Sequence, residues 1–164
     1  MAESLMFSSS TEQLRTLHEL DAHETAHQWF GDLITAQSGK HHWLQEGFAT
    51  YYALLAERAV FGEDYFYNKL FQSAQQLIQA AKTDSIPVLN PKASSLSFYQ
   101  KGAWALHVLR ENVGEKNFQK AVKSYLEKYS FKNEIKKPIQ RQKRLIHLYY
   151  NALPCNLYLC ISIT

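Results

Sequence analysis

The sequence of 164 residues has few cysteines, no long apolar run and no internal repeat. Its two cysteines, Cys155 and Cys160, are too few for a disulfide framework or a zinc finger, and they leave the redox compartment open. No stretch of 18 apolar residues is present, so we expect no membrane span. The first residues carry neither a basic region nor an apolar core, so no secretory signal is visible and the localisation stays unknown.

The composition, 46% hydrophobic and 20% charged residues, is that of a soluble globular domain. The charge is uneven, because residues 131–164 carry six basic residues and one acid (+5), whereas the preceding 130 residues sum to −2. A basic run can bind nucleic acid, but this one lacks stacking aromatics and a nucleic-acid-binding motif. We therefore interpret it as a solvated run and expect no nucleic-acid partner.

Apolar residues at helical spacing predict a mainly α fold with five helices. The predicted helices cover residues 11–29, 42–60, 63–81, 97–112 and 115–129. Gly31, Gly62 and Gly114 are expected to end helices, because glycine is the preferred residue just beyond a helix C-terminus. Residues 32–40 are predicted to be a short extended piece and a turn, and residues 83–96 a loop.

Residues 133–164 differ from the rest of the chain. They begin basic and end as an apolar run with tyrosine and cysteine, and they show neither strand alternation nor helical spacing. We predict that this tail is irregular and is a frame-shifted or artificial extension of the domain. Cleavage of the tail before the helices in limited proteolysis would support this prediction.

The segment His23-Glu24-Thr25-Ala26-His27 carries the chemistry of the chain. Two histidines four residues apart on a helix place both imidazoles on one face, at a separation that suits two ligands of one tetrahedral zinc ion. Glu24 follows the first histidine and is placed to take a proton from water. The alternative is an ordinary amphipathic helix in which the same five residues occur by chance.

A third ligand is needed for a catalytic zinc site. Similarity to thermolysin-like zinc peptidases, which take this ligand from a glutamate on the next helix, makes Glu46 the candidate. Two histidines and one glutamate leave the fourth position open, which is typical of catalytic rather than structural zinc. With Glu46 in place, the chance alternative becomes much less favoured.

Three spaced segments together resemble the aminopeptidase N family of gluzincin zinc metallopeptidases, which includes leukotriene A4 hydrolase. They are HETAHQWFGDLIT (residues 23–35), WLQEGFATY (43–51) and FYQKGA (98–103). The resemblance implies a thermolysin-like fold, of which residues 1–132 would be the helical part of the catalytic domain. The expected activity is hydrolysis of peptide bonds.

The roles of five residues follow from the resemblance. His23, His27 and Glu46 would bind one zinc ion, and Glu24 would act as general base and then as general acid. Tyr99 would donate a hydrogen bond to the oxyanion of the tetrahedral intermediate. Without the resemblance, Tyr99 would be interpreted as an ordinary aromatic residue at a helix start.

The chain departs from the family pattern in two places. The Gly-x-Met-Glu-Asn loop that holds the substrate's free amine is not among the 22 residues before His23, and Ala53 stands where a carboxylate is common. The alternatives are therefore a non-catalytic zinc-binding remnant and an endopeptidase. Because the domains of full-length relatives are missing, we also expect self-association through the surfaces that they would cover.

The remaining histidines and aromatics are interpreted as structural. His41 and His42, just before Trp43, could line the cleft, but a loop position is favoured, and His107 is expected in the core. Three large aromatics are expected to pack between the two ligand helices: Trp29, Phe30 and Trp43.

Overall fold

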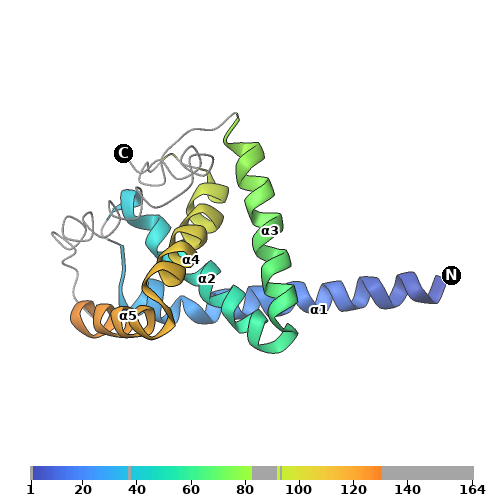
Figure 1. Ribbon diagram of the computed structural model, residues 1–164, viewed down its shortest axis with the longest axis horizontal. Helices are drawn as coiled ribbons and strands as arrows, with labels where there is room; N and C mark the ends of the chain where they lie inside the picture. Colours follow the sequence, from blue (N-terminus) through green and yellow to red (C-terminus); the bar gives the residue numbers. More distant parts are fainter. Residues whose placement is uncertain (1, 37, 83–91, 93, 131–164) are drawn as a thin grey trace.

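The computed structural model describes residues 2–36, 38–82, 92 and 94–130 (Figure 1). Within this part of the chain the regular structure is helical and no strand is present, which confirms the mainly α class. No helix in it is both long and apolar enough to cross a bilayer. The α-helices are α1 (Ala2–Ala26), α2 (His42–Phe61), α3 (Glu63–Ala80), α4 (Gly102–Val113) and α5 (Glu115–Tyr129). Short helical turns are η1 (Gln28–Leu33), η2 (Gly39–His41) and η3 (Ser97–Lys101).

The first helix was predicted with wrong bounds. It begins at Ala2 rather than at residue 11, because residues 2–30 contain neither glycine nor proline to interrupt the backbone hydrogen bonds. It ends at Ala26 rather than at residue 29, and the chain then enters η1, in which Phe30 and Gly31 leave helical dihedral angles.

The other bounds agree with the prediction to within a residue, with η3 and α4 together forming the helix predicted at 97–112. The extended piece and turn predicted at residues 32–40 are confirmed in part, because η1 continues to Leu33 but a turn, η2, starts at Gly39. Ile34, at φ −127° and ψ 108°, is extended. Most of the predicted loop 83–96 and all of the tail 133–164 lie outside the described residues.

Helix α2 is the centre of the fold and packs against α1, α3, α4 and η3 (Figure 1). Leu44, Phe48, Tyr51 and Leu55 recur at the spacing of one helix face and contact the main core cluster. Residues on other faces of α2 are buried as well, including Glu46. Buried charged side chains are rare unless they have a partner. The buried position of Glu46 therefore already suggests a function.

Two glycines join successive helices in the same way. Gly62 between α2 and α3 and Gly114 between α4 and α5 have φ of 91° and 78°, which side chains rarely adopt. Each donates its N–H to the carbonyl four residues earlier, at 2.9 Å in both cases. An arginine–glutamate ion pair spans each glycine, and the pairs are Arg58–Glu63 and Arg110–Glu115. The predicted helix ends at Gly62 and Gly114 are confirmed.

A second pair of glycines brings two helical segments into backbone contact. A Cβ added to Gly47 of α2 would lie 2.9 Å from the backbone of Gly102 at the start of α4. The reverse substitution would place a Cβ 2.9 Å from Cα of Gly47. Because Glu46 precedes Gly47 and Tyr99 lies three residues before Gly102, this close approach brings both side chains toward the same region.

Replacing Gly47 with alanine should lower the free energy of unfolding by about 1–3 kcal/mol, the usual cost of overpacking. The added methyl meets backbone atoms, which cannot rotate away as a side chain would. Urea unfolding followed by circular dichroism measures the change. Since alanine favours a helix over glycine by about 1 kcal/mol, a stabilised variant would contradict the close approach. Ala59→Gly, at an exposed site on α2, calibrates that helix-propensity contribution.

His107 lies in the core, as predicted. Its Nδ1 is 3.3 Å from the hydroxyl of Tyr51, which also accepts a hydrogen bond from Arg110. Burial lowers the pKa of His107, which keeps the ring neutral beside the arginine.

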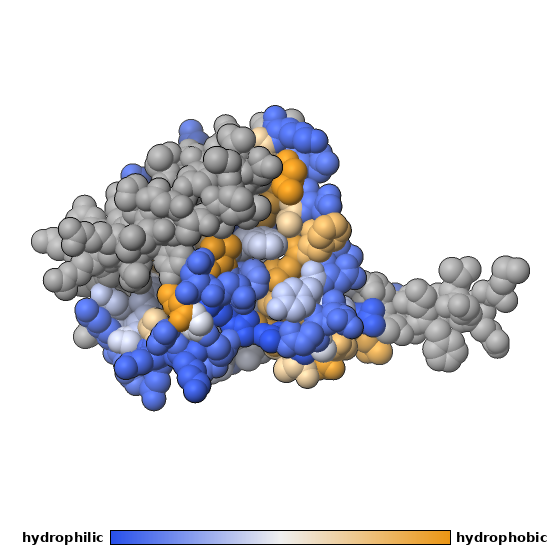
Figure 2. Space-filling view, in the orientation of Figure 1, coloured by the Kyte–Doolittle hydropathy of each residue, from blue (hydrophilic) through white to orange (hydrophobic). Residues whose placement is uncertain are grey.

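Several large apolar side chains are exposed on this part of the chain. Tyr67, Phe71 and Ile78 lie on one face of α3, and Figure 2 shows apolar surface along this helix. Trp29 is 45% exposed, so its predicted place between the ligand helices is wrong, whereas Phe30 and Trp43 are buried as predicted. Self-association through such surfaces stays a prediction.

Candidate metal centre

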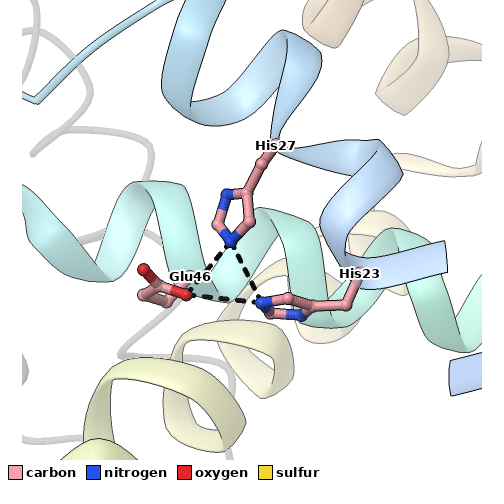
Figure 3. Close-up of side chains that lie close together, drawn as sticks. All are labelled: His23, His27 and Glu46. Carbon is pink, nitrogen blue, oxygen red and sulfur yellow. Dashed lines mark hydrogen bonds and ion pairs between the residues drawn. The ribbon is translucent and has the colours of Figure 1, made fainter. Parts of the chain in front are cut away.

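His23 lies on the last turn of α1, His27 directly follows the helix and precedes η1, and both face Glu46 of α2 (Figure 3). The three side chains come from two helices that pack against each other, so the site is formed by the α1–α2 contact. Glu46 is buried and both histidines are partly buried, which limits competition by water.

Three atoms converge in this site. Nε2 of His23 and Nε2 of His27 are 3.1 Å apart, and each is 3.4 Å from Oε2 of Glu46. Ligand atoms bound to a tetrahedral zinc ion at the usual bond lengths are separated by about 3.3 Å. The observed triangle therefore has the dimensions of one face of a zinc coordination tetrahedron.

The polar atoms of the site are incompletely satisfied without a cation. Oε2 of Glu46 is buried and has no hydrogen-bond partner within the described residues. A hydrogen bond between the two ring nitrogens satisfies only that pair, whereas a cation at the centre of the triangle would be a partner for all three atoms. Nitrogen and carboxylate donors in this number are the ligand set of catalytic zinc, so the residues fit this ion.

The turn η1 orients one of the two rings. Nδ1 of His27 lies 3.0 Å from the carbonyl oxygen of Phe30, to which its N–H donates. This hydrogen bond leaves the lone pair of the neutral ring on Nε2, the atom that faces His23 and Glu46. Gly31 leaves room for the ring, since a Cβ there would be 3.3 Å from Nδ1 of His27.

The pKa of His23 is lowered. Burial is the largest cause, and the charge interaction with the neighbouring His27 is the next. A neutral imidazole is the form that binds metal. The electrostatics of the site therefore favour the protonation state that a metal ligand needs.

Tyr99 lies beside the triangle, with its ring stacked on that of His23 at a centroid distance of 5.5 Å and an interplanar angle of 9°. Its pKa is raised, first by burial, then by a hydrogen bond to Glu46, and then by the negative charges of Glu46 and Glu24. The hydroxyl thus stays protonated at neutral pH and can donate a hydrogen bond.

Glu24 is exposed and is not part of the converging group. It follows His23 on α1, close enough for its charge to influence the pKa of both His23 and Tyr99. A carboxylate beside the three donors, open to solvent, is available for proton transfer.

The sequence did not identify His42 as a direct neighbour of Glu46. His42, expected in a loop, is the first residue of α2, and its Nε2 lies 3.2 Å from Oε1 of Glu46. The spacing of four residues between His42 and Glu46 was the available signal. Ala53, at the position where the family often has a carboxylate, is 2% exposed and belongs to the core.

Comparison with known proteins gives matches of one kind. The model of the peptidase family M1 domain matches residues 1–144. Human endoplasmic reticulum aminopeptidase 2 is 39% identical over 121 residues, which cover 68% of this chain and 13% of that protein. Aminopeptidase M1-D of Oryza sativa subsp. japonica is 38% identical over 124 residues, covering 68% of this chain and 14% of the rice protein. The chain thus spans about one seventh of the length of these curated relatives.

Solved structures agree in fold. The M1 zinc metallopeptidase of Deinococcus radiodurans superposes with a TM-score of 0.66 at 27% identity, over 89% of this chain and 33% of that one. A mutant of the same enzyme bound to a Tyr-Ser-Ala substrate superposes with the same TM-score at 26% identity, with the same coverage. The family match extends to residue 144, and the domain boundary at residue 132 stays a prediction.

Proposed function

Because this chain belongs to peptidase family M1, we propose that it carries the zinc site of a metallopeptidase that hydrolyses peptide bonds in the manner of an aminopeptidase. The observation that carries the proposal is the triangle of His23, His27 and Glu46, whose sides of 3.1–3.4 Å suit zinc. The human and rice relatives are aminopeptidases, which supports the substrate class.

His23, His27 and Glu46 would hold one zinc ion. Bound zinc supplies Lewis acidity, which polarises a peptide carbonyl and makes water more acidic. The carboxylate contributes negative charge and the two rings contribute neutral donors, and this combination leaves a net positive charge to act on the substrate. The burial of Glu46 strengthens that interaction, because few water molecules screen it.

Glu24 would take a proton from the attacking water and deliver it to the nitrogen of the leaving amine. Tyr99 would donate its hydroxyl proton in a hydrogen bond to the oxygen on which negative charge develops. Its stacking on His23 limits the movement of the phenol ring, so the donor is held beside the site. The raised pKa of Tyr99 supports this role, since only the protonated hydroxyl donates.

A second candidate is a zinc-binding remnant that does not turn over substrate. The observation that favours it is Ala53, a buried residue of the core that stands where the family often has a carboxylate. The two candidates agree on the metal and differ on catalysis, so they must be separated by turnover and not by metal content.

The test starts from metal content. We expect one zinc per chain by elemental analysis after dialysis, and hydrolysis of an aminoacyl-aminomethylcoumarin by the loaded protein. Bound zinc without turnover would favour the remnant, and no bound zinc would overturn both candidates. Parallel assays with a free and an N-acetylated peptide separate aminopeptidase from endopeptidase action, because acetylation removes the charged amine that an aminopeptidase recognises.

A further inference from the structure

The carboxylate of Glu46 has two oxygens in different surroundings. Oε2 faces the two ring nitrogens of the candidate metal centre, at 3.4 Å from each. Oε1 faces Nε2 of His42 at 3.2 Å. The carboxylate thus bridges the ligand triangle on one side and His42 on the other.

The geometry points to His42 as a positioning residue that holds Glu46 in the orientation needed to bind zinc. The assignment rests on the proposed function, and it names a residue outside the three ligands. A carboxylate on a flexible side chain can rotate about its last bond, and a hydrogen bond to one oxygen restricts that rotation. An N–H at Nε2 of His42 would donate to Oε1, 3.2 Å away, and would leave Oε2 directed at His23 and His27.

Two features of the fold hold His42 in place. It is the first residue of α2, four positions before Glu46, and residues at this spacing lie on the same helix face. The buried ring of Phe98 meets the His42 ring edge to face, at a centroid distance of 5.5 Å and an interplanar angle of 90°. Phe98 and Tyr99, neighbours in η3, therefore contact two different histidines beside the site.

His42 is not a fourth ligand in this arrangement. The group of donor atoms that lie within 4.8 Å of one another consists of His23, His27 and Glu46 in the described part of the chain. His42 reaches the other oxygen of the carboxylate and acts through Glu46. Partners of metal-bound carboxylates typically change metal affinity by about 10- to 100-fold when removed. We expect about a 10-fold effect, because the side chain of His42 is 47% exposed.

The experiment measures zinc affinity by competition with a chromophoric chelator at pH 7.5, using the whole chain. His42→Leu should bind zinc about 10-fold more weakly than wild type, and His42→Gln, whose amide N–H can reach Oε1, should stay within about threefold. His18→Leu, an exposed histidine on α1, is the matched control and should bind as wild type does. The visible spectrum of the cobalt(II) form should change in His42→Leu and return toward wild type in His42→Gln.

Equal zinc affinity of wild type and His42→Leu would overturn the assignment and leave the proposed function intact. An affinity of His42→Gln as low as that of His42→Leu would also overturn it, because a donor at this position would then not matter. A wild-type protein that binds no zinc would overturn the proposed function, and the assignment with it. Thermal unfolding of the metal-free variants is measured in parallel, and a zinc-affinity loss matched by loss of the folded state would count against positioning.

Discussion

Replacing Glu24 with glutamine should lower the turnover of the zinc-loaded protein about 100- to 10,000-fold, the usual contribution of a general base. Glutamine keeps the shape of the side chain but cannot take a proton from water. Zinc content should stay at the wild-type level, because Glu24 is not part of the converging ligand group. Hydrolysis of an aminoacyl-aminomethylcoumarin, followed by fluorescence, measures the first effect, and elemental analysis measures the second.

Glu111→Gln provides the control for the loss of one exposed carboxylate elsewhere on a helix, and it should leave turnover unchanged. Turnover of Glu24→Gln within a few fold of wild type would exclude the proposed role of Glu24. Absence of turnover in wild type as well, with zinc bound, would instead support the remnant.

Replacing Glu46 with glutamine should weaken zinc binding about 100- to 1,000-fold. This range follows from dividing the roughly 10–16 kcal/mol of apparent zinc-binding free energy among four ligands. Glutamine preserves the volume of the buried side chain and removes the charge that attracts the cation. Competition with a chelator of known affinity measures the change.

Glu57→Gln is the matched control, because Glu57 is a buried glutamate of the same helix that contacts Tyr65 and not the site. Burial raises the pKa of Glu57, so the neutral amide is more easily accommodated at this buried position than a charged group would be. If Glu46→Gln and Glu57→Gln had the same zinc affinity, Glu46 could not be a ligand.

Much of the helical fold was predictable because its signals are local. Helix α5 begins and ends where predicted, since Gly114 marks its start and apolar residues recur along one face. The start of α1 was not predictable in the same way. Ser10 and Thr11 can cap a helix, but they also continue one when no glycine or proline interrupts the chain.

The candidate site was predictable to the extent that its residues follow a helical spacing or a family motif. The pair His23 and His27 follows from the spacing, while Glu46 came from the resemblance, and the structure brings the three together. Their binding of zinc stays a prediction. The predicted start of α2, at residue 42, was correct, but His42 itself was interpreted as a loop residue. The spacing of four residues between His42 and Glu46 was therefore not considered.

Contacts between distant segments were beyond sequence reasoning. Gly47 and Gly102 are 55 positions apart, and neither lies in a turn that would require glycine. The exposure of Trp29 has a similar origin, because the chain leaves helical dihedral angles at Phe30 and Gly31, directly after that residue. In both cases the outcome depends on how two segments approach each other, and single-helix periodicity does not contain that information.

At the turn η1, the tautomer of His27 is set by a hydrogen bond to a main-chain atom and not to a side chain. The acceptor at Nδ1 is the carbonyl of Phe30, which every amino acid at that position would supply. Point substitutions between residues 28 and 33, other than at Gly31, therefore keep the hydrogen bond as long as the turn keeps its path. Insertion or deletion of a single residue would shift the carbonyl away from the ring. Natural variation compatible with the site should accordingly alter side chains in this turn while preserving its length.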